Sequence, residues 1–331
     1  MKYKHTLALI WTQYTLMLYM LIIDDWKKTL LFLYKGRIGS DIIKKIHEKG
    51  GRFFCGYWLT YLLCLQVDNI VFKAFRFLIE ELINVFLQIW IRIIGKDNIY
   101  VYGYEHVFGA LACLNAGCHF EVIEDGMASY NSKEKTEMFW RKYSSRYAKP
   151  EKFLSGGWSD AVEKVILTGR QKTPIGLEGK TRIVNMKMMW DNIDIARKKE
   201  IFYIFNFKLQ RWQEIVAGGR DIIFLTQNLS PMWMEEDNEI SLIRELLSEY
   251  DHKRIIIKIH PADKKDYDRL FPKCLIVRDT FPVELLWLEC LPIKKVVGIY
   301  STALYGTWPE EMVTMREDLL KKYARPEMKN M

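Results

Sequence analysis

The chain has 331 residues, of which 50% are hydrophobic, 14% aromatic and 27% charged, and its formal net charge is +8. A chain of this length can form two domains with separate cores, and its apolar content excludes an intrinsically disordered protein. The excess of basic residues favours an anionic partner: a nucleotide-sugar, a nucleic acid or an acidic membrane surface.

The first segment, residues 6–23, contains no charged side chain. A signal anchor is one interpretation, although polar residues interrupt the apolar run. The other is a strand over 6–11 followed by an apolar helix over 12–23. We favour the strand and helix, because another strand and another helix are predicted directly afterwards, over 28–34 and 41–48.

Residues 69–94 form a long apolar stretch in which hydrophobic side chains recur at helical spacing. The interpretation we favour is an amphipathic helix that packs on the sheet of an N-terminal domain. The alternative is a helix whose aromatic and basic residues contact lipid, as a peripheral protein on the inner face of the cytoplasmic membrane. The apolar region 52–94 also favours self-association into a homodimer.

Six cysteines are present, with no C-x-x-C pair, and four of them lie in apolar or helical contexts. This pattern predicts reduced thiols in a cytoplasmic protein and indicates no zinc site.

A strand is predicted over 99–104, a helix over 105–115 and a strand over 119–123, and this alternation favours a parallel sheet. Residues 127–180 lose the alternation and are rich in lysine, arginine, serine and glycine. We predict an irregular or helical insertion there, which shapes an acceptor site. Residues 181–207 are not assigned to elements.

The second half of the chain is expected to form its own α/β domain. Gly218-Gly219 breaks the chain before a new strand, so we predict domains over 1–210 and 218–331. Beyond the break, strands and helices alternate. The predicted strands are 221–225, 254–259, 275–277 and 295–300, and the predicted helices are 239–250, 266–271 and 283–289.

Three polar motifs each follow a predicted strand. They are Glu124-Asp125-Gly126, His260-Pro261 and Ser301-Thr302. Proline cannot donate to a sheet ladder, so the strand before His260 must end there. Ligands bind outside the carboxyl ends of parallel strands, and a helix N-terminus holds phosphate. His260 and the hydroxyls of Ser301 and Thr302 are therefore expected to converge on one phosphate.

In order and spacing, the segments KIHP, FPVELL and STAL resemble the C-terminal half of bacterial sialyltransferases, and Glu124-Asp125-Gly126 is similar to a second motif of those enzymes. The resemblance is to glycosyltransferase family 52, the lipooligosaccharide sialyltransferase group. It implies a GT-B-like α/β fold, with two Rossmann-like domains whose parallel sheets face a central cleft. It also implies inverting transfer of sialic acid from CMP-sialic acid to a galactose-type hydroxyl of lipooligosaccharide or capsule.

The resemblance implies roles for individual residues. His260 would contact the phosphate of the donor and assist the departure of CMP. Glu284 would hold the ribose hydroxyls, for which a carboxylate is a good acceptor. Further substrate contacts are expected from residues of the three motifs and one lysine near them: Glu124, Gly126, Lys258, Pro261, Ser301 and Thr302. No metal or other cofactor is expected, because basic and hydroxyl groups can stabilise the phosphate.

Attack by a sugar hydroxyl also requires a proton acceptor. Of two adjacent carboxylates, one can raise the pKa of the other toward the value that a catalytic base needs. Side chains alternate along a strand, so at most one of Glu124 and Asp125 faces the reaction, and we favour Asp125 as the base. The acidic loop Glu235-Glu236-Asp237 offers a second candidate: the resemblance to family 52 implies a base in this region, and Asp237 is the residue to test.

Two other functions stay open. One is a related transferase that uses another nucleotide-sugar, such as a UDP-hexose. The other is a non-catalytic protein that binds nucleic acid or a membrane surface. The basic residues are dispersed and no RNA-recognition signature is present, so a nucleic-acid partner is not expected.

Overall fold

The computed structural model describes residues 4–33, 38–64, 70–105, 109–143, 155–230, 233–260, 262–299, 301–304 and 308–326. Its contacts divide the chain into two compact units, Met1–Phe205 and Asn206–Met331. The division falls a few residues before the end predicted for the first domain, and residues 209–217 therefore belong to the second unit.

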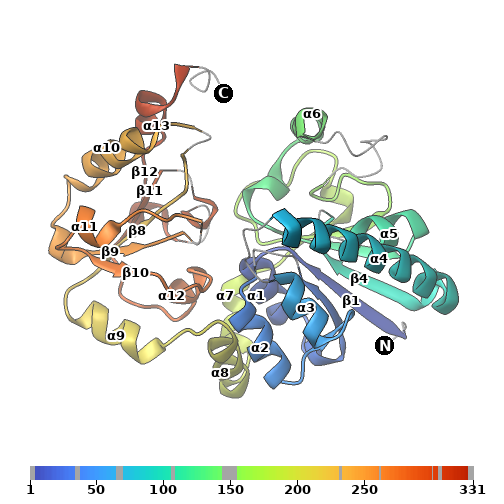
Figure 1. The fold of residues 1–331 in the computed structure, drawn as a ribbon. Helices are drawn as coiled ribbons and strands as arrows, with labels where there is room; N and C mark the ends of the chain where they lie inside the picture. The colour runs from blue at the N-terminus through green and yellow to red at the C-terminus, as the bar shows by residue number, and fades with distance from the viewer. Residues whose placement is uncertain are drawn as a thin grey trace. The chain divides into compact units, whose positions relative to one another are not determined.

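The first unit contains a seven-stranded, fully parallel sheet in the order β3-β2-β1-β4-β5-β6-β7 (Figure 1). The strands are β1 His5–Ile10, β2 Leu30–Leu33, β3 Arg52–Phe53, β4 Ile99–Gly103, β5 His119–Ile123, β6 Val162–Leu167 and β7 Thr181–Ile183. Buried parallel strands are typically continuous apolar runs, which is why β1, β2, β4 and β5 could be predicted.

The helices of the first unit are α1 Gln13–Ile22, α2 Ser40–Glu48, α3 Tyr57–Cys64, α4 Ile70–Ile94, α5 Ala110–Ala116, α6 Lys133–Tyr143, α7 Met186–Asn192 and α8 Ile195–Ile204. Because β1 and α1 form a strand and helix inside this unit, the interpretation of residues 6–23 as a βα pair is confirmed. In the described part of the chain, no helix has the length and apolar character needed to cross a membrane.

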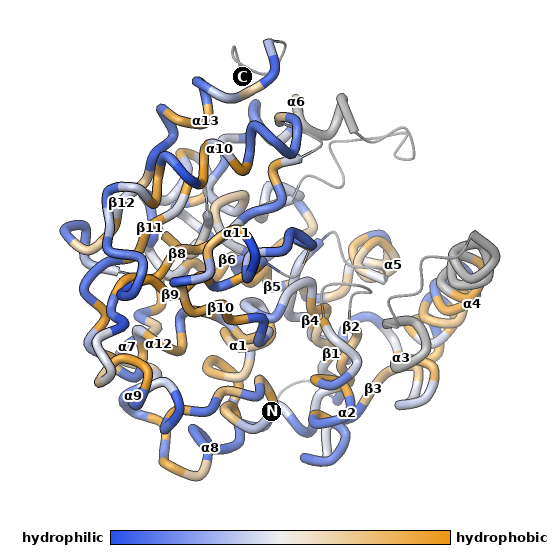
Figure 2. Tube along the Cα trace, turned by 60° about the vertical axis from the view of Figure 1, so that its left-hand side comes forward, coloured by the Kyte–Doolittle hydropathy of each residue, from blue (hydrophilic) through white to orange (hydrophobic). Residues whose placement is uncertain are grey.

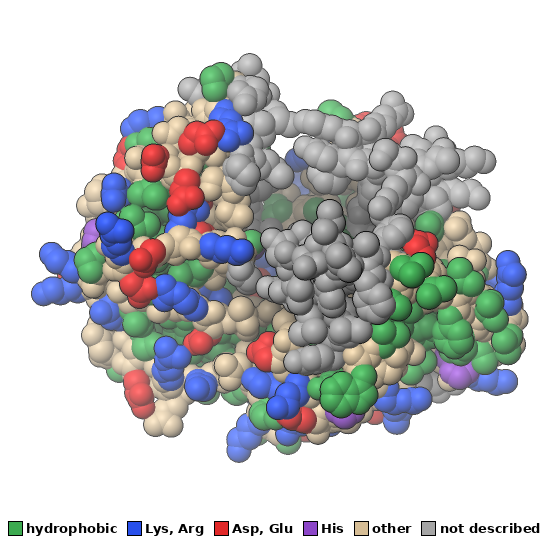
Figure 3. Space-filling view, in the orientation of Figure 1, with side chains coloured by type: hydrophobic (Ala, Val, Ile, Leu, Met, Phe, Trp, Pro, Cys, Tyr) green, Lys and Arg blue, Asp and Glu red, His purple; other side chains and the backbone are tan. Residues whose placement is uncertain are grey.

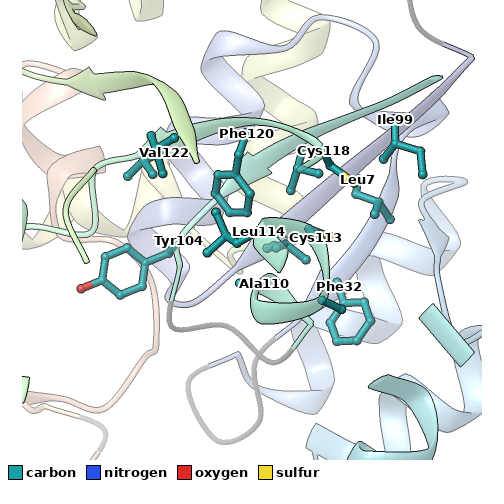
Figure 4. Close-up of a cluster of buried hydrophobic side chains, with 14 of the residues drawn as sticks. Leu7, Phe32, Ile99, Tyr104, Ala110, Cys113, Leu114, Cys118, Phe120 and Val122 are labelled. Atoms are coloured by element: carbon teal, nitrogen blue, oxygen red, sulfur yellow. The ribbon is translucent and has the colours of Figure 1, made fainter. Parts of the chain in front are cut away.

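Helices α4 and α5 cover one face of the first sheet. Leu7, Val101 and Phe120 point from the strands into the same buried cluster as Leu87 of α4 and Cys113 of α5 (Figure 4). The predicted packing of α4 on the sheet is therefore confirmed. On the other face, α1 packs through contacts such as that between the rings of Tyr19 and Tyr102 on β4, whose centroids lie 5.9 Å apart.

The prediction for residues 127–180 was wrong in one respect. Strand β6 lies within them and pairs with β5, so part of this region extends the sheet instead of forming an insertion. The sequence of β6, VEKVIL, includes Glu163 and Lys164, both exposed, and these charges masked its strand character. Helix α5 also begins later than predicted, at Ala110, which leaves Glu105 outside it.

The second unit contains a five-stranded parallel sheet in the order β10-β9-β8-β11-β12. The strands are β8 Ile222–Leu225, β9 Ile255–Lys258, β10 Leu275–Val277, β11 Lys295–Gly298 and β12 Val313–Met315; the helices are α9 Leu209–Ala217, α10 Glu236–Leu247, α11 Tyr267–Leu270, α12 Glu284–Leu288 and α13 Glu317–Tyr323. Strands β8 and β9 are hydrophobic runs (Figure 2), and Phe224 and Ile257 lie fully buried between them and α10.

Candidate active site

Both sheets follow the order of a Rossmann-type fold, in which the direction of winding reverses once. The reversal lies between β1 and β4 in the first unit and between β8 and β11 in the second. In such sheets ligands bind outside the carboxyl ends of the strands near the reversal. Residues that bind substrate or take part in catalysis are therefore expected directly after β1, β4, β5, β8, β9 and β11.

His260 lies two residues after the end of β9 and is exposed. Its amide donates to Thr226 Oγ1 at 2.8 Å, which ties it to the segment that follows β8. Its ring nitrogen Nδ1 accepts a hydrogen bond from the amide of Ala262 at 3.1 Å. Because Nδ1 acts as the acceptor, the neutral ring carries its proton on Nε2. The local backbone thus selects the tautomer that can donate from Nε2.

A buried charged network holds the turn that carries His260. The amide of Asp263 donates to the carbonyl of His260 at 2.8 Å, and the carboxylate of Asp263 lies 3.1 Å from Lys265 Nζ. Lys265 also contacts Glu239 at 2.8 Å. Glu239 is fully buried and accepts from the amides of Leu229 and Ser230. The loops after β8 and β9 are therefore fixed to each other beneath the histidine.

Lys258, the last residue of β9, is more deeply buried than the sequence suggested. Its side chain is buried, and Nζ donates to the carbonyl of Asp279 at 3.1 Å and lies 4.4 Å from the centre of the Phe281 ring. Burial lowers the pKa of Lys258 to about 8, and the carboxylates of Asp279 and Glu284 oppose that shift. Lys258 therefore supplies positive charge under the strand end at neutral pH.

The other predicted groups of the second unit have different surroundings. Glu284 is the first residue of α12 and is only 4% exposed, so a ribose would have to reach a nearly buried carboxylate. Ser301 is half-buried after β11. The residues that follow form a single 3₁₀ turn, Thr302–Leu304, where the sequence suggested a longer helix. The argument from a helix N-terminus therefore does not hold at this position. Pro261 lies outside the described residues, as does the side chain of Thr302.

Gly298, the last residue of β11, lies close to Leu304. A Cβ at this position would lie 2.7 Å from Leu304 Cδ1, so a larger residue would require the Leu304 side chain to move.

In the first unit, Asp125 follows β5 and is half-buried. Its Oδ1 accepts hydrogen bonds from Thr12 Oγ1 at 2.6 Å and from Thr15 Oγ1 at 2.5 Å. Thr12 is also the N-cap of α1 and accepts from the amide of Thr15. The cap of the helix after β1 therefore orients the carboxylate after β5. Gly126, which follows, has a φ of 98°, a conformation that favours glycine.

Glu124 is an internal anchor, contrary to the expectation that it contacts substrate. It is fully buried, and its carboxylate accepts four hydrogen bonds and forms one ion pair. Tyr14 and Tyr130 donate through their hydroxyls and Thr168 through its amide and hydroxyl, and Arg170 Nε lies 3.1 Å from the carboxylate as the partner in the ion pair. A carboxylate so engaged links β5 to α1 and to the segment after β6.

Glu105 was missed by the sequence analysis. It lies two residues after β4 and is buried, and its carboxylate accepts from the amides of Gly156 and Gly157 at 3.3 and 2.7 Å. Burial raises the pKa of Glu105 to about 7, although the two amides and the nearby Lys180 act against it. Gly156 in turn lies against the backbone of Ser129, whose hydroxyl accepts from the amide of Asp125. Its place after an apolar strand was the signal that could have identified Glu105.

Asp237 is exposed on the first turn of α10, whereas the sequence analysis placed it in a loop. Among the residues that the structure describes, none forms a hydrogen bond or an ion pair with its carboxylate. Unlike Asp125, Asp237 is a solvent-exposed acid in a first helical turn, where a negative charge stabilises the helix N-terminus.

The described residues contain no group of three or more histidine, cysteine, aspartate or glutamate side chains placed to hold a metal ion. One D-x-D sequence occurs, Asp266-Tyr267-Asp268. Asp266 caps α11 by accepting from the amide of Arg269, and Asp268 forms an ion pair with Arg278. Both carboxylates thus have structural partners.

Two units, each with a parallel sheet of Rossmann-type order, are the architecture of the GT-B class of glycosyltransferases. The chain belongs to glycosyltransferase family 52, whose family model matches residues 42–316. It is therefore an enzyme. An uncharacterized protein of Haemophilus influenzae is 30% identical over 223 residues, which cover 67% of this chain and 69% of that protein.

Solved structures share the fold at low sequence identity. The GT-B domain of a sialyltransferase from Photobacterium damselae is 13% identical, with a TM-score of 0.57, and the match covers 93% of this chain and 89% of that one. A 2,6-sialyltransferase from Photobacterium sp. JT-ISH-224, in complex with the donor product CMP and the acceptor lactose, is 12% identical with a TM-score of 0.57, over 94% and 71% of the two chains. These likenesses establish the architecture of the two units.

Proposed function

We propose that this protein is an inverting sialyltransferase that moves sialic acid from CMP-sialic acid to a galactose-type hydroxyl of a bacterial surface glycan, lipooligosaccharide or capsule. Membership of family 52 supports the reaction class. A structural relative binds CMP and lactose, which supports the choice of donor and acceptor. The observation that carries the proposal is the hydrogen bond from the Ala262 amide to His260 Nδ1, at the carboxyl edge of a Rossmann-type sheet, which leaves Nε2 as the donor nitrogen of the ring.

In the proposed reaction, the bond between the anomeric carbon of sialic acid and the phosphate oxygen breaks, and its electron pair leaves with CMP. A hydroxyl oxygen of the acceptor forms the new bond from the opposite side, through an oxocarbenium-like transition state. His260 donates from Nε2 to the phosphate as negative charge develops there. The buried ammonium of Lys258 adds a positive field under the same strand end.

The proton of the acceptor hydroxyl passes to Asp125. Two threonine hydroxyls fix one oxygen of this carboxylate, whereas Asp237 is exposed on a helix surface. Pre-oriented groups contribute more to catalysis than groups that must be ordered during the reaction, so Asp125 is the better base.

The test is incubation with CMP-sialic acid and galactose-terminated acceptors, among them lactose, with mass detection of the product. We expect release of CMP and addition of one sialyl group, unchanged by a metal chelator. Parallel reactions contain UDP-glucose or UDP-galactose. Transfer of hexose alone would establish the other nucleotide-sugar as donor and contradict the proposal. Tight, salt-dependent binding of RNA without turnover of any nucleotide-sugar would contradict it as well.

A further inference from the structure

Tyr267, the first residue of α11, is fully buried in the core of the second unit. Its ring stacks on that of Phe271, with the centroids 6.2 Å apart. Phenylalanine would fill this space equally well, and a buried hydroxyl costs stability unless it finds a hydrogen-bond partner. The hydroxyl of Tyr267 has such a partner, because it donates to Asp263 Oδ2 at 2.7 Å. Packing therefore explains the ring of Tyr267, and its hydroxyl requires another explanation.

Two buried residues hold the peptide groups of His260. The His260 amide donates to Thr226 Oγ1 at 2.8 Å, and the His260 carbonyl accepts from the amide of Asp263 at 2.8 Å. Thr226 is 3% exposed and Asp263 is 7% exposed. The backbone of the histidine is therefore fixed on both sides, on one side to the segment after β8 and on the other to its own turn.

Tyr267 joins these two supports. Burial raises the pKa of Tyr267, as does its hydrogen bond to Asp263, while a hydrogen bond with the side chain of Thr226 acts to lower it. Since the phenol proton goes to Asp263, the Thr226 hydroxyl is the donor toward Tyr267. Hydrogen bonds thus run from the amide of His260 through Thr226 and Tyr267 to Asp263, whose own amide donates to the carbonyl of His260. The four residues form a closed ring.

Buried charges keep the acceptor of this ring in place. Charged side chains spread over the protein surface in Figure 3, whereas the side chains of Glu239, Asp263 and Lys265 are at most 5% exposed. Burial acts to lower the pKa of Lys265, but its hydrogen bonds with Glu239 and Asp263 raise it above the ordinary value, so the ammonium stays charged. Replacing a buried ionic network by apolar residues is often neutral or stabilising. A rigid turn therefore explains the network better than a gain in stability does.

We propose that Tyr267 is a positioning residue for His260, which fixes the histidine backbone through Thr226 and Asp263 and thereby aims the Nε2 proton at the leaving phosphate. This role rests on the function proposed above, in which His260 assists the departure of CMP. A displacement of about 1 Å at a catalytic group can slow a reaction about 10²-fold. The hydroxyl of Tyr267 thus acts on the reaction only through the place of the imidazole.

The first test measures steady-state transfer from CMP-sialic acid to lactose by the full-length protein. Tyr267→Phe removes only the hydroxyl, and we expect kcat to fall about tenfold or more while the KM for CMP-sialic acid stays within about threefold. Thr226→Ser keeps its hydroxyl and should stay within about threefold of the original rate, whereas Thr226→Val should lose as much as Tyr267→Phe. The combination of Tyr267→Phe and Thr226→Val should be within about threefold of the slower single variant, because either change opens the same ring.

Tyr323→Phe serves as the matched control. Its hydroxyl also donates to a carboxylate of the second unit, Glu245 at 2.6 Å, but it belongs to α13 and not to the ring. The kcat of Tyr323→Phe should stay within about twofold of the original. Circular dichroism should show native melting for every variant. A loss of kcat in Tyr323→Phe equal to that in Tyr267→Phe would overturn the proposal, and so would a raised KM with normal kcat in Tyr267→Phe.

The second test observes the imidazole without substrate. In protein with isotope-labelled histidine, the nitrogen chemical shifts of His260, assigned with His260→Ala, report which ring nitrogen carries the proton. At a pH where the ring is neutral, the unchanged protein and Tyr323→Phe should show a protonated Nε2, whereas Tyr267→Phe and Thr226→Val should show shifts averaged over both tautomers.

An unchanged tautomer in Tyr267→Phe would overturn the positioning role, whatever the rate of transfer. Averaged shifts in Tyr267→Phe, together with no sialyl transfer by the unchanged protein, would contradict the proposed function and leave the hold of Tyr267 on His260 established. The two failures are therefore distinguishable.

Discussion

The two sheets have the same winding order but different chemistry at their carboxyl ends. In the first unit, the groups after β4 and β5 are acids, Glu105, Glu124 and Asp125, and side chains or glycine amides from distant segments hold them. In the second unit, the candidate group after β9 is the imidazole of His260, which the backbone and a buried network of charged residues hold in place. A shared topology thus supplies only the place for function, and the strand-end residues decide its chemistry.

Of the three acids at the strand ends of the first sheet, we expect only the half-buried Asp125 to take part in the reaction. Asp125→Asn should lower the rate of transfer by about 10²- to 10⁴-fold, because an amide cannot accept the proton of the acceptor. The measurement is the single-turnover rate with saturating donor and acceptor.

Asp237→Asn is the matched control for that change, and its rate should stay within about threefold of the original. If Asp237→Asn lost activity and Asp125→Asn retained it, the catalytic base would belong to the second unit and the contrast between the two edges would fail.

Glu124 should affect stability instead of chemistry. Glu124→Leu removes the partner of the buried Arg170 guanidinium and leaves four other donors without their acceptor. We expect a loss of about 3–5 kcal/mol in the free energy of unfolding, measured in urea. The control is Glu163→Gln, an exposed acid on β6, which should cost less than about 1 kcal/mol. Equal losses in the two variants would show that Glu124 is not an anchor.

In the second unit, the neutral His260 ring is expected to act as a single hydrogen-bond donor. His260→Ala should slow transfer by about 10²- to 10³-fold, the usual effect of removing one donor that stabilises developing charge. His252→Ala removes a histidine from the same unit, at a position away from the strand end, and should stay within about twofold. Circular dichroism of both variants checks the fold. A His260→Ala enzyme with normal turnover would exclude a role in the departure of CMP.

The contrast between the edges also shows what the sequence can reveal. His260 was identified because it follows the apolar run of β9, and Asp125 because its motif follows a short predicted strand, so both strand ends were visible in the sequence. Their supports were not visible. Thr12 reaches Asp125 across 113 residues, and Glu105 reaches Gly157 across 52, so only the folded chain brings these groups together. Strand β6 was missed because two of its six residues are exposed charges, and β12 was missed because its three residues, Val313-Thr314-Met315, form no buried apolar run.

The smallest expected effect concerns Glu105 and is a dependence on pH. The ordinary pKa of a glutamate is near 4.5, and burial raises the pKa of Glu105 to about 7. Between these two values the unfolded chain has released the proton while the folded chain keeps it, so folding is favoured at low pH and this contribution is lost as the pH rises through 7. The free energy of unfolding should therefore fall by about 3 kcal/mol between pH 4.5 and pH 8 on account of this residue.

Glu105→Gln isolates that contribution, because it keeps the shape of the side chain and removes its titration. The difference in unfolding free energy between the two proteins should change across pH 4.5 to 8 and be constant above it, whereas titration of all other groups cancels in the difference. A difference independent of pH would mean that the amides of Gly156 and Gly157 hold a carboxylate already ionised at pH 4.5.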